Sequence, residues 1–213
     1  MKDPKTFLIQ SELNDLGFGP LVEDGINGPK TRDAYNAWYI STRGTSADPD
    51  APDGVFKTEF RKSPHQGGKI VPKYIVLHSS YGKVAGDISW ITQDRDHSKV
   101  SYHYLVRPDT GNRVQFVKTD RRAYHAGRSV WKGRKWLNGC SIGIACTGSS
   151  KRQWNAQEVL SVAMLCDDIM KENPSIGYDD ILTHQDIAPD RKDDTSKENQ
   201  QAVLAKLREI RGE

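Results

Sequence analysis

The sequence predicts an α/β fold in which a mixed central β-sheet is flanked by helices and preceded by a small three-helix domain. After residue 70, short segments rich in β-branched and aromatic residues alternate with helical patterns, which is typical of a domain built on one sheet. Before residue 63, apolar residues recur at helical spacing, and a stretch rich in glycine and polar residues follows. We therefore expect a helical domain at 1–62, a flexible linker at 63–70 and an α/β domain at 71–213.

The N-terminal segment carries two helical patterns separated by a turn. The first ends at Gly17 and Gly19, and its apolar positions are Phe7, Leu8, Leu13 and Leu16. The second runs from Thr31 to about Tyr39, and the intervening Asp-Gly favours a turn with positive φ. The order IQSELNDLGF, DGINGPKTRDAYNAW and DGVFKTEF resembles the peptidoglycan-binding module of many cell-wall hydrolases, although Lys57 stands where glycine is common. The alternative is a three-helix bundle that binds no ligand.

The α/β domain contains five strand patterns and two clear helices. The strand patterns are YIVLH (74–78), YHYLVR (102–107), RVQFV (113–117), SIGIAC (141–146) and DILTH (180–184). The segment 155–173 predicts a helix because Asn155 and Glu158 have the spacing of a capping box. A last helix follows Ser196, and its apolar side consists of Val203, Leu204, Leu207 and Ile210.

Composition limits the functional classes. No apolar run reaches the roughly 18–20 residues that a membrane span needs, and the N-terminus lacks the apolar segment of a signal peptide, so we expect no stable membrane insertion. The formal net charge of +3 and the scattered basic residues give little support for a nucleic-acid partner. The cysteines at 140, 146 and 166 lack CxxC spacing, so we expect no disulfide framework.

Two histidines end strongly apolar strand patterns. His78 and His184 are expected to emerge where loops gather, and Asp194 follows ten residues after His184 across a loop that contains Pro189. Two imidazoles and one carboxylate suit Zn²⁺ and leave a fourth position for water, whose pKa can then approach about 7. The alternative for each histidine is a structural residue with satisfied hydrogen bonds.

Five ordered motifs strengthen the metal hypothesis. YIVLH, YHYLVRPDTG, AYHAG, NGCSIGIACTG and THQDIAPDRKDD resemble those of the zinc-dependent type 2 N-acetylmuramoyl-L-alanine amidases, relatives of the peptidoglycan recognition proteins, over roughly residues 70–200. The resemblance implies that His78, His184 and Asp194 bind zinc. The chain departs from the family's last motif at three positions, which are Asp190, Thr195 and Ser196. The Lys-x-Asp register selects Asp194, although the adjacent Asp193 leaves an alternative.

The same resemblance implies the residues of catalysis. Lys192 matches a family lysine near the scissile carbonyl, where an ammonium can stabilise the developing oxyanion. Some members carry a glutamate after S-I-G-I, but this chain has Ala145, which cannot transfer a proton. Other members use a tyrosine at the position of Tyr102, whose phenol can donate a hydrogen bond and relay a proton. The alternatives are a tyrosine that only packs and a solvated loop lysine.

Other histidines have weaker signals. His125, in AYHAG, resembles a substrate-cleft position of the family and is predicted to contact substrate; the alternative is a loop histidine that holds backbone. His103 is expected to form hydrogen bonds in the core rather than bind metal. Asp186 is expected to cap or brace its loop, or to support a ligand histidine from behind.

These features predict a monomeric peptidoglycan hydrolase that uses Zn²⁺ to cleave the amide between the lactyl group of N-acetylmuramic acid and L-alanine. A wall-binding module without a signal peptide suggests a phage or prophage endolysin, made in the bacterial host cytoplasm and acting on the cell wall after another protein opens the membrane. The alternatives are a cytoplasmic muropeptide-recycling amidase, a recognition protein that binds peptidoglycan without cutting it, and a non-haem iron oxygenase with the same ligand types.

Overall fold

The computed structural model describes residues 4–26, 28, 30–31, 34–35, 38, 56–96, 98–150 and 152–213. The chain divides into two compact units, one of residues 1–57 with 208–213 and one of residues 58–207. None of the described helices is long and apolar enough to cross a lipid bilayer.

In the N-terminal unit, helix α1 (Pro4–Asp15) is followed by an Asp-Gly turn. Gln10 holds this turn, because its side-chain oxygen accepts hydrogen bonds from the backbone N–H groups of Asp24 and Gly25 at 3.0 and 2.9 Å. Gly25 has the positive φ, 71°, that the sequence predicts. The helix predicted at 31–39 and the end of the predicted domain lie largely outside the described residues.

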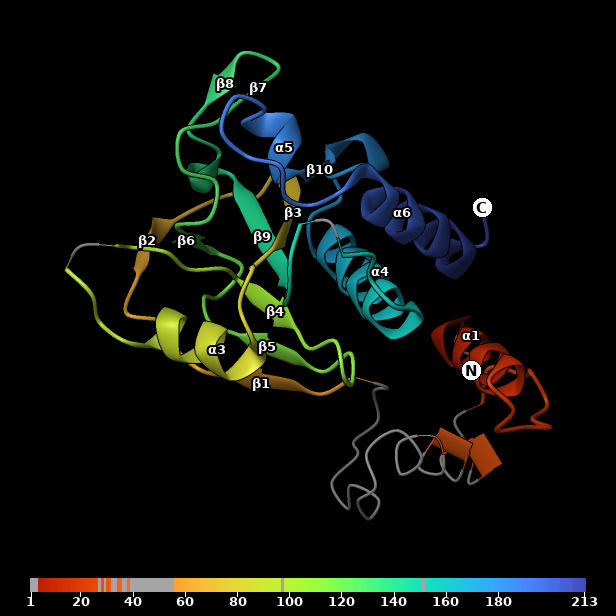
Figure 1. Cartoon of the computed structure of the whole chain (residues 1–213). Helices are drawn as coiled ribbons and strands as arrows, with labels where there is room; N and C mark the ends of the chain where they lie inside the picture. The colour runs from red at the N-terminus through yellow and green to blue at the C-terminus, as the bar shows by residue number, and fades with distance from the viewer. Residues whose placement is uncertain are drawn as a thin grey trace. The chain divides into compact units, whose positions relative to one another are not determined.

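The second unit is built on a mixed sheet, as predicted, and this sheet has six strands (Figure 1). Its strand order is β1-β5-β4-β9-β3-β10, and only the β4–β5 pair is antiparallel. The strands are β1 (Thr58–Phe60), β3 (Tyr74–Ser79), β4 (Tyr104–Val106), β5 (Arg113–Gln115), β9 (Ser141–Cys146) and β10 (Ile181–Thr183). Two small antiparallel pairs add β2 (Gln66–Lys69) with β6 (Arg121–Ala123), and β7 (Val130–Trp131) with β8 (Arg134–Lys135).

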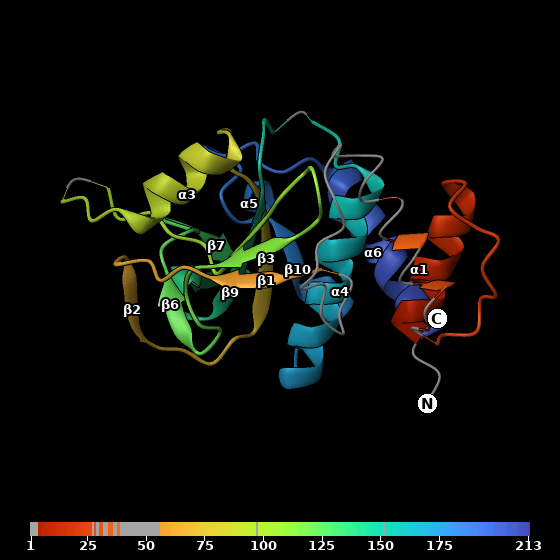
Figure 2. The same cartoon turned by 90° about the horizontal axis from the view of Figure 1, so that it is seen from below.

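Helices cover both faces of this sheet (Figure 2). Helix α3 (Val84–Thr92) packs Ile88 and Ile91 against one face, which includes Leu105 and Ala145. Helix α4 (Ala156–Glu172) lies on the other face, where the buried guanidinium of Arg113 donates to the hydroxyl of Ser161 at 3.0 Å. Successive residues of a strand point to opposite faces, so His78, Gly143 and Ala145 share the α3 side.

The two predicted helices of the α/β domain are confirmed. Helix α4 begins with the expected capping box, in which the Asn155 side chain accepts from the Glu158 N–H and the Glu158 carboxylate accepts from the Asn155 N–H, both at 3.0 Å. Helix α6 (Lys197–Arg211) follows Ser196 and buries Val203 and Leu207.

The structure differs from the prediction between residues 58 and 70. Thr58–Phe60, expected within the helical domain, form the edge strand β1 and pair with Arg113–Gln115. The segment 63–70, expected as a flexible linker, contains strand β2 and buries Ser63 and His65. These residues belong to the second unit because their backbone groups pair with β5 and β6, which a local sequence pattern does not reveal.

Candidate metal centre

Two adjacent parallel strands bring the predicted histidines together. His78 lies near the end of β3, and His184 follows directly after β10 as the first residue of helix α5 (His184–Ile187). Because β3 and β10 are neighbours and run in the same direction, their carboxyl ends meet at one edge of the sheet. Thr183 caps α5, since its hydroxyl accepts from the Asp186 N–H at 3.1 Å, and the carboxylate of Asp186 completes the capping box.

Asp194 reaches the same place from the loop that follows α5. Its backbone carbonyl accepts a hydrogen bond from the Gln185 N–H at 3.0 Å, which fixes the loop beside the helix. Asp193 points elsewhere: it is exposed, and its carboxylate accepts hydrogen bonds from the hydroxyls of Tyr81 and Ser150. Of the two adjacent carboxylates, only Asp194 therefore faces the histidines.

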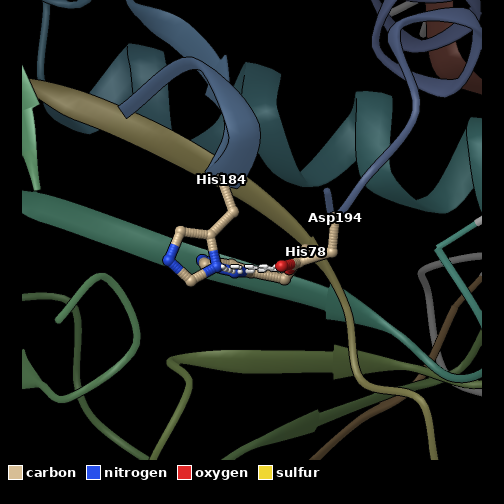
Figure 3. Close-up of side chains that lie close together, drawn as sticks. All are labelled: His78, His184 and Asp194. Atoms are coloured by element: carbon tan, nitrogen blue, oxygen red, sulfur yellow. Dashed lines mark hydrogen bonds and ion pairs between the residues drawn. The ribbon is translucent and has the colours of Figure 1, made fainter. Parts of the chain in front are cut away.

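The three side chains point toward one another (Figure 3). His78 Nδ1 lies 3.1 Å from His184 Nδ1, and Asp194 Oδ2 lies 3.3 Å from each of these nitrogens. All three residues are at least 97% buried. Among the described residues, this is the group of histidine, cysteine and carboxylate side chains arranged so that they could share one ion.

Burial sets the charge of this cluster. Desolvation, followed by the neighbouring His184, lowers the pKa of His78 to about 4. His78 is therefore neutral near pH 7, which is the state in which imidazole binds metals.

One hydrogen bond fixes how the His184 ring faces the cluster. His184 Nε2 lies 3.3 Å from the carbonyl oxygen of Ala126, which only accepts, so in the neutral ring Nε2 carries the proton and Nδ1 presents a lone pair. Asp194 Oδ1 lies 3.2 Å from that bare Nδ1, and no hydrogen bond reaches this buried oxygen from the described residues. A metal cation between these two buried acceptors would satisfy both of them.

The spacing also fits zinc. Ligand atoms at about 2.0–2.1 Å from a tetrahedral Zn²⁺ are separated by about 3.3–3.4 Å, close to the 3.1–3.3 Å found between these three side chains. Two neutral imidazoles and one carboxylate match the ligand types of catalytic zinc sites, which keep one position open. The residues present therefore fit the metal that the sequence predicts.

The predicted catalytic residues lie near this cluster. The ring centroid of Tyr102 is 5.1 Å from that of His78, and burial raises the pKa of the Tyr102 phenol, so its hydroxyl stays protonated at neutral pH. Lys192 lies on the turn two residues before Asp194, is partly exposed, and its positive charge contributes to the lowered pKa of His78. The hydroxyl of Tyr102 can therefore donate a hydrogen bond at neutral pH.

His125, which is predicted to contact substrate, lies in the interior beside His78. Its side chain is buried, with 6% of the residue exposed, and its Nδ1 lies 3.0 Å from His78 Nε2, on the side of that ring opposite to Asp194. His103 is fully buried, as expected for a core residue: its Nδ1 accepts from the Gly143 N–H at 2.9 Å, and its Nε2 donates to the carbonyl of Arg121 at 2.8 Å.

A pocket of about 320 Å³ adjoins Tyr102 and was not predicted from the sequence. Its lining residues are Ser80, Gly86, Asp87, Trp90, Ile91, Val100 and Tyr102. The wall formed by α3 combines an indole with a half-buried carboxylate that accepts a hydrogen bond from Ser80. Single residues on a nine-residue helix give no sequence signal for such a pocket, because it forms only when the helix packs beside Tyr102.

Comparisons with known proteins agree with this geometry. A family model described as N-acetylmuramoyl-L-alanine amidase matches residues 67–197. The 1,6-anhydro-N-acetylmuramyl-L-alanine amidase AmpD of Salmonella typhimurium is 39% identical over 98 residues, which cover 46% of this chain and 51% of that protein. The N-acetylmuramoyl-L-alanine amidase AmiD of Escherichia coli is 30% identical over 140 residues, covering 57% and 48%.

Comparison of the fold with solved structures also finds similarity to AmpD. The crystal structure of a selenomethionine AmpD derivative superimposes with a TM-score of 0.63 at 26% identity, covering 72% of this chain and 94% of that chain. In sequence, the chain spans about half the length of the AmpD and AmiD relatives that it matches. The match with AmpD in space therefore extends over more of the chain than the match in sequence.

Proposed function

Because the chain belongs to the N-acetylmuramoyl-L-alanine amidase family, we propose that it is a zinc-dependent peptidoglycan hydrolase. The bond cleaved is the amide between the lactyl group of N-acetylmuramic acid and the L-alanine of the stem peptide. The observation that carries the proposal is the buried cluster of His78, His184 and Asp194, whose facing atoms lie 3.1–3.3 Å apart and could share one ion.

The ligand set determines the type of chemistry. Bound zinc would act as a Lewis acid and lower the pKa of water to about 7, which suits hydrolysis of an amide at neutral pH. His78 and His184 are neutral ligands, and Asp194 contributes the only negative charge, so the site keeps the net positive charge that favours such hydrolysis.

Two side chains of the chain would assist the reaction. Amide hydrolysis develops negative charge on the carbonyl oxygen, and the protonated phenol of Tyr102 and the ammonium of Lys192 are the donors that we assign to that oxygen. Ala145 pairs in register with His78 and offers no proton-transfer group. We therefore assign the return of a proton to the leaving amine to Tyr102 or Lys192 rather than to a carboxylate.

The bond can be identified directly by mass spectrometry. Purified sacculi digested with the full chain should release stem peptides that begin with a free L-alanine amino group. A His78→Ala variant that retains the fold should release none. Release of disaccharide fragments without free stem peptides would refute the proposed bond.

The metal can be tested in the same preparation. Protein purified without added metal is depleted with a chelator and then supplied with Zn²⁺ or Fe²⁺ in separate portions. Recovery of peptide release with zinc alone is expected. Recovery only with iron and oxygen would favour the oxygenase with the same ligand types.

Two cellular roles are compatible with such a hydrolase. The resemblance of residues 1–62 to a peptidoglycan-binding module supports an endolysin that acts on the intact wall. A second candidate, hydrolysis of soluble anhydro-muropeptides, is supported by the 39% identity to AmpD of Salmonella typhimurium. The full chain should be compared on intact sacculi and on a soluble anhydro-muramyl tripeptide. Cleavage of the soluble fragment alone would contradict the endolysin role.

A further inference from the structure

We propose that His125 and Ala126 form a positioning device that fixes the ring protons of both metal-binding histidines. This inference rests on the metal site proposed above. The side chain of His125 contacts His78, and the carbonyl of Ala126 contacts His184, so two consecutive residues hold the outer nitrogen of each ligand. Such outer partners select the tautomer and orientation of a ligand imidazole.

A chain of hydrogen bonds determines the tautomer of His78. The hydroxyl of Ser141 donates its proton to the carbonyl of Leu137 at 2.7 Å, so its oxygen can only accept from His125. His125 Nε2 lies 3.3 Å from that hydroxyl and 3.4 Å from the Ser141 carbonyl. With two acceptors beside it, Nε2 of His125 carries the ring proton.

The opposite nitrogen of His125 is therefore an acceptor. Its Nδ1 accepts the proton of His78 Nε2 across 3.0 Å, and His78 Nδ1 is left with a lone pair directed at Asp194 and His184. Both ligand histidines thus present unprotonated Nδ1 atoms to the same point.

The device is rigid because its backbone and its ring are both held. The side-chain oxygen of Asn138 accepts from the backbone N–H groups of His125 and Ala126 at 3.0 and 2.7 Å. The His125 ring lies directly on β9, where a Cβ added to Gly143 would come within 2.5 Å of His125 Cγ. A side chain at residue 143 would occupy the space that this ring fills.

A role for His125 in contacting substrate fits these observations less well. Its side chain is buried, and both of its ring nitrogens already have partners inside the protein. The His125 ring lies 5.1 Å, centroid to centroid, from the His78 ring in an edge-on arrangement. It contacts His78 Nε2, whereas Asp194 contacts His78 Nδ1. His125 therefore acts on the reaction through His78.

The test compares two substitutions of similar size. His125→Asn keeps an acceptor oxygen near the position of Nδ1, whereas His125→Leu removes it. Zinc affinity is measured by competition with a chromogenic chelator, and the absorption spectrum of the Co²⁺-loaded protein reports ligand geometry. We expect about 10- to 100-fold weaker zinc binding and an altered cobalt spectrum for the leucine variant, and near-unaltered values for the asparagine variant.

Controls separate positioning from packing. His103→Asn alters a second buried histidine, which packs edge-on to the His125 ring at 5.7 Å but whose ring nitrogens bond to the Gly143 N–H and the Arg121 carbonyl, so it should lower stability without changing zinc affinity. If His125→Leu does not fold, Asn138→Ala and Asn138→Asp are compared instead of the two His125 variants. Alanine removes the side-chain oxygen that holds residues 125–126, whereas aspartate keeps it.

Three outcomes decide the proposal. Weaker zinc binding for the leucine or alanine variant with recovery by its conservative counterpart supports it. Unaltered zinc binding in the leucine variant, or equal weakening in both members of a pair, overturns it. Zinc binding is measured without substrate, so absence of peptide release by the zinc-loaded unaltered protein would refute the proposed function separately.

Discussion

Replacing Gly143 by alanine should damage the metal centre without touching a ligand. The added Cβ would lie 2.5 Å from His125 Cγ and 2.6 Å from its Nδ1, whereas ordinary contacts begin at 3.4 Å. The ring must therefore retreat by about 0.9 Å, or the strand must shift by that amount. Such a displacement can stretch the 3.0 Å bond to His78 beyond hydrogen-bonding distance.

The expected magnitudes follow from overpacking. Forcing one extra carbon into a filled core costs about 1–3 kcal/mol, which corresponds to a Tm lower by roughly 2–12 °C for a chain of this size. Loss of the outer partner of His78 should also weaken zinc binding by about 10- to 100-fold. Calorimetry in chelator gives the first quantity, and chelator competition gives the second.

A matched glycine provides the control. Gly68 also lies in a strand, β2, but an added Cβ there meets no atom within 4 Å. Gly68→Ala should therefore keep the Tm and zinc affinity of the unaltered protein within experimental error. If Gly143→Ala behaved like Gly68→Ala in both assays, the packing of the His125 ring on β9 would be refuted.

Three further predictions follow. Zinc at 1,000 times its Kd should stabilise the unaltered protein by about 4 kcal/mol. Asp194→Ala should abolish this stabilisation, whereas Asp193→Ala should retain it. Equal increases of Tm on addition of zinc to the two variants would contradict the choice of Asp194 as ligand. Tyr102→Phe and Lys192→Ala should each lower kcat about 10²- to 10³-fold with unaltered zinc content, and an unchanged kcat would remove that donor. Burial lowers the pKa of His103 to about 4, below the roughly 6.5 of an unfolded histidine, so the unfolded chain binds the extra proton between these values. The free energy of unfolding should fall as the pH falls from 6.5 to 4, and His103 contributes up to about 1.4 kcal/mol per pH unit to this fall. In the presence of chelator, His103→Asn should make the free energy of unfolding less dependent on pH. An unchanged pH dependence in this variant would refute the role assigned to His103.

The sequence predicted the buried strands better than the exposed or glycine-rich ones. Strands β3 and β9 are buried on both faces, so they consist of near-continuous apolar residues that are recognisable in the sequence. Strand β1 is exposed, and β2 reads QGGK; both depend on pairing with distant strands. No local pattern distinguishes such segments from a linker.

The residues of the candidate site were also only partly predictable from the sequence. His78 and His184 were recognisable because each ends an apolar strand pattern, and the motif register indicated Asp194. The position of His125 was not predictable, since its burial depends on a glycine in β9 and on Asn138, which lies thirteen residues later in the chain. Hydrogen bonds that connect separate segments leave no periodic signal in the sequence.

The separation of His78 and His184 along the chain has a consequence for metal binding at the proposed site. His78 and His184 are 106 residues apart, and the second histidine is positioned only when β10 docks at the edge of the sheet beside β3. Closing a loop of this length has an entropic cost that a bound ion cannot offset until both histidines are in place. A growing or truncated chain that ends before β10 would hold one ligand and could not retain zinc. Zinc held by all three proposed ligands would therefore require that β10 has already docked beside β3.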